Sequence, residues 1–119
     1  MKKLALATAV LATLMTTGCA QRIADFTLAS TKNVDLNSGQ FVKGERVEGI
    51  DKKYVVLFPL GVPSVKEAAD RAIETNPCAV ALTDVTADSE AFAFLFGYVQ
   101  YKIEGDLVID TSRTGCSSN

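Results

Sequence analysis

The side chains that could carry chemistry in this 119-residue sequence are three cysteines and a scatter of carboxylates. The chain contains no histidine, so the commonest general base and metal ligand is absent. Cys78 and Cys116 lack the CxxC spacing of a zinc site, which needs four ligands. Four carboxylates near expected strand ends could pair for acid–base work: Asp84, Asp88, Glu90 and Asp106. A solvated sheet edge explains them more simply, so we predict no catalytic residue, no metal site, no cofactor and no small-molecule substrate.

The third cysteine, Cys19, follows a stretch that is typical of a secretory signal. Lys2 and Lys3 precede the apolar run Leu4–Met15, and small residues follow that run. The run has about 12 residues, which is too few to cross a bilayer core of about 30 Å as a helix. We therefore expect a signal for export and no transmembrane anchor.

The end of this signal, Gly18-Cys19, resembles the bacterial lipobox. The resemblance implies that the Cys19 thiol receives a diacylglycerol, that the signal is cut before Cys19, and that the new amine is acylated. Thr16 stands where leucine is usual in that motif. Two other interpretations stay open: ordinary signal cleavage after Ala20, and an uncleaved hydrophobic N-terminus. By resemblance to enteric lipoproteins, Ala20 after the cysteine favours the outer membrane, with the protein facing the periplasm.

These features predict four segments. Residues 1–18 are expected to be the signal peptide, 19–24 a lipidated tether, 25–112 one small domain, and 113–119 a frayed C-terminal tail. The five residues after Cys19, Ala20–Ala24, reach at most about 18 Å, so the domain would lie close to the membrane. The net charge is −2 and becomes more negative once Lys2 and Lys3 leave with the signal. Mild acidity disfavours nucleic acid as a partner, because nucleic-acid binding needs a clustered basic face.

Cys78 and Cys116 form an even pair once Cys19 carries lipid. In an oxidising compartment such a pair is a disulfide candidate. Closing the chain between them would stabilise a small domain by about 3–4 kcal/mol in the chain-entropy model. The alternative is two unpaired thiols, one buried and one in the tail.

The remaining pattern predicts an α+β domain with a small mixed sheet and one helix on one face, in the order β-β-α-β-β. Strands are expected near residues 26–31, 41–47, 54–60 and 79–87, and the apolar run 54–60 is expected to be buried on both faces. A helix should begin at Ser64, with a capping box between Ser64 and Glu67. Its apolar stripe comprises Val65, Ala68, Ala69, Ala72 and Ile73. Strand, helix and strand together predict a right-handed parallel crossover.

The last long stretch, residues 91–111, carries an aromatic row that changes phase. Phe92, Phe94, Phe96 and Tyr98 occupy even positions, and the apolar residues after them occupy odd ones. A bulge or hairpin turn is expected near Gly97, although a turn at residues 88–90 is the alternative. If one face of one strand exposed these aromatic rings, they would form an interaction surface for a partner or for the membrane interface. The competing interpretation is that they pack in the core.

From Gly49 to Val108 the order of features resembles small proteobacterial lipoproteins of the TRL-like kind. The matching pieces are SVKEAADRAI, AVALTDV and YKIEGDLV, which cover about half of the chain. The resemblance implies a lipoprotein with an α+β domain, and it carries over no catalytic residue or ligand. We therefore expect a non-catalytic envelope lipoprotein, attached to the membrane by its lipid, with a protein-binding or structural role. The alternative is an exclusion or immunity lipoprotein that acts against a phage or toxin.

Overall fold

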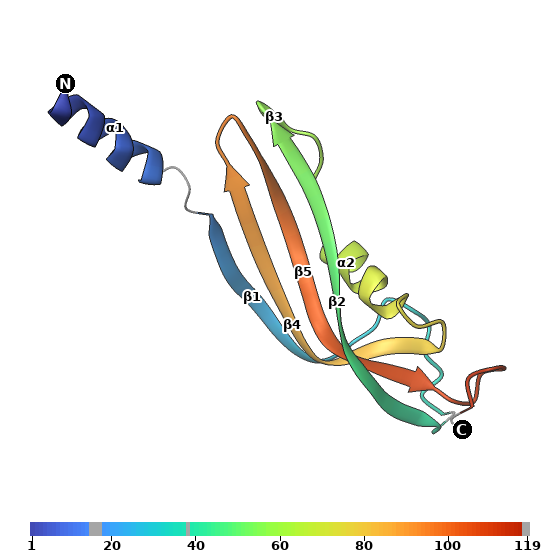
Figure 1. Ribbon diagram of the computed structural model, residues 1–119. Coiled ribbons are helices and arrows are strands. Elements are labelled where there is room, and N and C mark those ends of the chain that lie inside the picture. The colour runs from blue at the N-terminus through green and yellow to red at the C-terminus, as the bar shows by residue number, and fades with distance from the viewer. Residues whose placement is uncertain (15–17, 38, 118–119) are drawn as a thin grey trace.

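The computed structural model describes residues 1–14, 18–37 and 39–117, and its class is α+β (Figure 1). The lipobox positions Thr16 and Thr17 lie outside the described residues. In chain order the elements are α1 (Lys2–Leu14), β1 (Cys19–Ala29), β2 (Phe41–Val56), β3 (Phe58–Pro59), α2 (Val65–Ile73), β4 (Ala79–Ala93) and β5 (Phe96–Asp110). The expected order β-β-α-β-β is confirmed, with the two-residue β3 added before α2.

The strands form one sheet in the order β1-β4-β5-β2-β3, and every neighbouring pair is antiparallel. The expectation of a mixed sheet is therefore wrong in this detail. Strands β2 and β4, which lie before and after α2 in the chain, do run parallel to each other, because each pairs antiparallel with β5. They are not neighbours, however, since β5 lies between them. A tight hairpin turn places β5 beside β4. Strand β5 therefore occupies the position next to β4 that β2 would take in a parallel pair.

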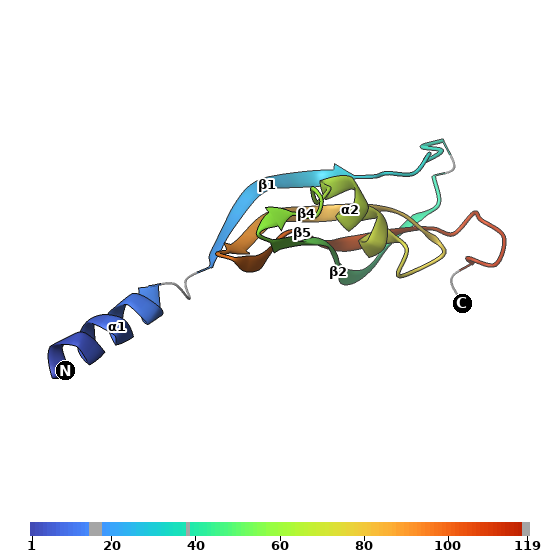
Figure 2. The same ribbon diagram turned by 90° about the horizontal axis from the view of Figure 1, so that it is seen from above.

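Helix α2 packs on one face of the sheet, as its alanine-rich stripe predicts (Figure 2). Ala68, Ala72 and Ile73 are completely buried. Gly49 in β2 permits this close approach, because a Cβ there would lie 2.0 Å from the Ala68 carbonyl oxygen. Beneath the helix the core is completed by large apolar residues of the two central strands: Leu82, Val85, Ile103 and Leu107.

The helix begins after Ser64, but the expected capping box does not form. Ser64 has the extended backbone of an N-cap residue and makes no side-chain capping hydrogen bond. Its carbonyl oxygen accepts the Ala68 N–H at 3.1 Å, and its own N–H donates to Asp51 Oδ2 at 2.8 Å. A carboxylate from the sheet, rather than the helix's own Glu67, therefore fixes this end of the helix.

Two strands extend beyond their predicted limits. The stretch expected to hold separate strands at 41–47 and 54–60 is mostly one strand, β2, which is 16 residues long. Strand β1 begins at Cys19, so residues 19–24 belong to the sheet and are not the expected tether. The expectation that 54–60 is buried on both faces is wrong, because Phe58 is 76% and Leu60 71% exposed. This end of the sheet projects beyond the part that α2 covers.

The phase change near Gly97 is a hairpin turn between β4 and β5. Phe94 and Leu95 form the turn, and Ala93 pairs with Gly97 across it. Residues 88–90, the alternative turn, lie inside β4. The four aromatic residues therefore do not line one strand, which corrects the expected arrangement. Phe92 instead lies opposite Tyr98, with ring centroids 6.5 Å apart.

Candidate functional site

The lipidation candidate Cys19 is the first residue of β1, a strand at the edge of the sheet. Its side chain is exposed, its thiol is free, and its backbone lies opposite Ala91 of β4. This pairing places Cys19 at the same end of the sheet as the β4–β5 turn. The β2–β3 turn lies at this end as well, because Val56 pairs with Phe96 (Figure 1). The sequence does not predict that Cys19 lies beside these turns, because the expected tether would leave Cys19 without a fixed position relative to the sheet.

The two turns meet in one apolar surface, which we call the apolar tip. The Leu57 N–H donates to the Leu95 carbonyl oxygen at 2.9 Å and so ties one turn to the other. Residues 54–63 and 91–99 contain no charged side chain. The tip consists of large apolar side chains that are 43% to 83% exposed: Val56, Leu57, Phe58, Leu60, Val62, Phe94, Leu95 and Phe96.

The aromatic row divides between this tip and its border. Phe94 and Phe96 are each 64% exposed, so the interpretation of the whole row as core is wrong for these two rings. Phe92 and Tyr98 are half-buried. The aromatic pattern identifies one side of the tip. The apolar run from Tyr54 to Leu60, which belongs to the other side, instead predicts a buried strand.

Basic and phenolic side chains lie along the border of the tip. Tyr54 pairs with Tyr98 across β2 and β5, and the Lys52 ammonium lies 4.5 Å from the centre of the Tyr98 ring. This distance is within the range of a cation–π contact. On the face that carries α2, the neighbouring Lys53 donates to Asp51 at 3.2 Å. The surface therefore changes from apolar to aromatic and then to charged within a few residues of β2, where Glu90 lies at the same level of the sheet as Lys52.

Asp51 is the one fully buried carboxylate among the described residues, and sequence reasoning missed it. Its Oδ2 accepts the Ser64 N–H, while its Oδ1 lies 3.2 Å from Lys53 Nζ and 3.5 Å from Arg71 Nη2. The Ser64 hydrogen bond, followed by Lys53 and Arg71, lowers the pKa of Asp51 against the opposing effect of burial. Arg71 also donates to the Ile50 carbonyl oxygen at 2.6 Å. Asp51, Lys53, Ser64 and Arg71 form a charged cluster that joins the sheet to the helix, which we call the Asp51 clamp. Both carboxylate oxygens of Asp51 have partners in this cluster.

Of the four carboxylates considered for acid–base work, the structure brings together only Asp84 and Asp106. Lys43 Nζ joins them, at 3.1 Å from Asp84 and 2.9 Å from Asp106. The hydrogen bond from Lys43 is the main cause of the lowered pKa of Asp106. A carboxyl group held as the anion by a lysine is poorly suited to donate a proton near neutral pH.

The other two carboxylates lie apart from this pair. Asp88 forms an ion pair with Arg22 at 3.5 Å, and Glu90 accepts a hydrogen bond from Gln100 at 2.6 Å. Within the described ranges, no three His, Cys, Asp or Glu residues are grouped so that they could hold a metal ion. No described helix is both long and apolar enough to cross a membrane.

An apolar groove of about 350 Å³ lies at the opposite end of the sheet from Cys19. One side is formed by the end of β1 and the loop after it, and the other by the sheet itself. A cavity of this size lies at the lower end of the range for binding pockets. Its lining residues are Leu28, Ser30, Lys32, Val34, Leu36, Phe41, Ala81 and Val108.

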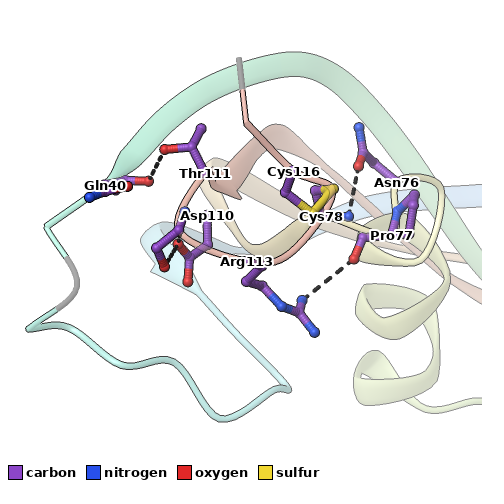
Figure 3. Close-up of a disulfide and its surroundings, with 9 residues drawn as sticks. Gln40, Asn76, Pro77, Cys78, Asp110, Thr111, Arg113 and Cys116 are labelled. Carbon is purple, nitrogen blue, oxygen red and sulfur yellow. Dashed lines mark hydrogen bonds between the residues drawn. A yellow bond between two sulfur atoms is a disulfide. The ribbon is translucent and has the colours of Figure 1, made fainter. Parts of the chain in front are cut away.

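The cysteine pair holds the same distal end together (Figure 3). The sulfur atoms of Cys78 and Cys116 lie 1.99 Å apart and their Cα atoms 5.5 Å apart, which is disulfide geometry. The Thr111 N–H donates to the Gln40 carbonyl oxygen at 2.9 Å, and Arg113 donates to the Pro77 carbonyl oxygen at 3.4 Å. The expectation of a frayed tail is therefore wrong as far as Cys116, because this segment is fastened to the start of β4.

Comparison with known proteins identifies no relative of this chain. No protein-family model, no curated protein and no solved structure matches the chain.

Proposed function

We propose that the protein is a non-catalytic lipoprotein of the bacterial envelope, anchored through acylated Cys19 and binding a protein partner at its far end. The outer membrane is the expected site, with the domain facing the periplasm. One observation carries this proposal: the anchor position and the apolar groove lie at opposite ends of one continuous sheet. An anchored chain would hold its groove away from the lipid, where an envelope protein can reach it.

The dimensions of the sheet support such a spacing role. Strand β5 has 15 residues, which corresponds to at most about 50 Å of extended chain. The disulfide pair and the Thr111–Gln40 hydrogen bond keep the groove end in one shape. A preformed apolar cavity lowers the ordering cost of binding, because few side chains need to be fixed when the partner arrives.

Site-specific photocrosslinking in intact cells tests the binding site. A photoreactive amino acid replaces Leu36, which is 73% exposed and lines the groove. The matched control places the same amino acid at Glu67, an exposed position on α2. We expect a protein adduct of defined size from position 36 and none of that size from position 67. Equal labelling from both positions would reject the groove as the binding site, as would an adduct formed only from position 94.

Membrane fractionation of Cys19→Ala tests the anchor. We expect this variant to accumulate as unprocessed precursor or to appear in the soluble periplasm, because the acceptor for the lipid is gone. The adduct from position 36 should then weaken. A variant that is cut to the same size and stays in the membrane fraction would show that Cys19 is not the lipid attachment site.

A further inference from the structure

We propose that the apolar tip inserts into the lipid leaflet that holds the acyl chains of Cys19, so that the domain stands end-on in the membrane surface. This inference depends on the lipid anchor of the proposed function. It adds a second point of contact with the membrane, formed by the folded domain. The apolar tip would then contact lipid, and the groove at the distal end would remain the surface that binds a protein.

The depth of the tip fits this arrangement. Cys19 lies opposite Ala91, and Phe94 is three residues farther along the chain, in the turn after β4. Three residues of strand correspond to about 10 Å. Segments that lie in a membrane interface bury their apolar side to a depth of about 5–10 Å. With Cys19 at the level of the lipid headgroups, the turns would reach the upper part of the acyl chains.

The chemical gradient along the tip matches a membrane interface. The uncharged turns come first, and the tyrosines Tyr54 and Tyr98 follow at the border. Tyrosine favours this level of a bilayer, because its ring is apolar and its hydroxyl remains hydrated. Lys52 lies two residues from Tyr54 on β2, where its ammonium can reach lipid phosphate groups while its stem remains beside the apolar surface.

Backbone groups at the turns already have partners within the protein. The Leu57 N–H donates to Leu95, the Leu60 N–H to Tyr54, and the Phe94 N–H to Phe96. An unpaired peptide group is costly to move from water into hydrocarbon. These two linked turns can therefore enter the leaflet without exposing those N–H groups to it.

Lipid is also the surface that the tip meets first. Acyl chains on Cys19 would hold the tip within a few residues of the bilayer, which gives lipid a very high effective concentration. A second copy of the chain or another protein would have to compete with this permanent neighbour.

The test uses tryptophan as a depth probe, because the chain contains none. Mature lipidated Phe94→Trp is reconstituted into vesicles of phosphatidylethanolamine and phosphatidylglycerol that contain lipid brominated near the top of its acyl chains. Leu36→Trp is the matched control, since Leu36 is also a large exposed apolar residue but lies at the distal end. We expect the brominated lipid to quench most of the emission of Phe94→Trp and none of that of Leu36→Trp. Aqueous iodide should give the reverse order.

Each other outcome overturns the inference or its premise separately. Protein that floats with the vesicles while iodide quenches Phe94→Trp would show a tip in water, which rejects the insertion and leaves the anchor intact. Emission shielded from both quenchers would place a second protein copy over the tip and reject lipid as its occupant. Protein that fails to float with the vesicles would reject the lipid anchor itself.

Discussion

The backbone N–H of Ser64 donates to Asp51 Oδ2 at 2.8 Å, and this contact joins the start of α2 to the middle of β2. The same carboxylate lies beside Lys53 and Arg71, so one buried anion connects a strand, a loop and a helix. In the part of the chain that the structure describes, α2 is the one helix that covers the sheet. Asp51 therefore adds a polar attachment to the apolar packing that holds the two layers together.

Replacing Asp51 with Asn should lower the free energy of unfolding by about 1–3 kcal/mol, because it removes the charge that faces Lys53 and Arg71. The measurement is the denaturation midpoint in urea. Glu67→Gln provides the control, since Glu67 is exposed on the same helix. Equal midpoints for the two variants would show that the clamp adds no stability.

The same carboxylate predicts how stability depends on pH. Partners lower the pKa of Asp51, mainly through Ser64, and that of Asp106, mainly through Lys43. The unfolded chain binds protons at these groups near pH 3.9, before the folded protein does. Their contribution is therefore complete above about pH 5 and is lost as pH falls through the lowered folded-state values. Thermal unfolding at several pH values should show this loss, and Asp51→Asn should show less of it.

Gly49→Ala should be strongly destabilising. The added methyl group would lie 2.0 Å from the Ala68 carbonyl oxygen and 2.5 Å from the Ala72 nitrogen, so the helix would have to move away from the sheet. Overpacking of this kind costs about 1–3 kcal/mol. Gly61→Ala is the control, because its methyl group would meet only the flexible Lys53 stem at 3.4 Å. Similar urea midpoints for both variants would contradict the close packing of α2 on β2.

The disulfide can be tested by counting thiols. Alkylation of the unreduced, denatured protein should modify neither Cys78 nor Cys116, and reduction should make both reactive. Cys78→Ser combined with Cys116→Ser should lower stability by about 3–4 kcal/mol in the chain-entropy model. Full alkylation of both cysteines without a reductant would mean that they do not pair.

Local sequence patterns predict the helix correctly, whereas the strand order of the sheet depends on contacts between segments that are distant in the chain. The stripe that contains Ala68, Ala72 and Ile73 identifies the buried face of α2, because helical spacing is visible within one segment. The partner of β2 could not be read in this way, because β5 comes much later in the chain and pairs with β2 along nearly its whole length. Phe94 and Leu95 gave no turn signal, as neither is a typical turn residue.

The same contrast between local patterns and distant contacts explains which features of the candidate site can be predicted from the sequence. The pairing of Cys78 with Cys116 follows from the number of cysteines and the expected compartment, while lipidation of Cys19 stays a prediction. Exposure of the stretch from Tyr54 to Leu60 depends on how far α2 extends over the sheet, which no local pattern states. The role of Asp51 could not be predicted either, because Ser64 and Arg71 come close to it only when α2 packs on the sheet.

The position of Cys19 at the end of β1 also has a mechanical consequence. Hydrogen bonds between β1 and β4 run perpendicular to the strands, from the Cys19–Ala91 pair to the Ala29–Leu82 pair. With Cys19 anchored in a membrane as we propose, a pull between the membrane and β4 or β5 would act along β1 and load this ladder in shear. The bonds would then share the force instead of breaking one at a time from the end. Such a sheet would be suited to withstand tension between the proposed lipid anchor and the proposed protein partner at the groove.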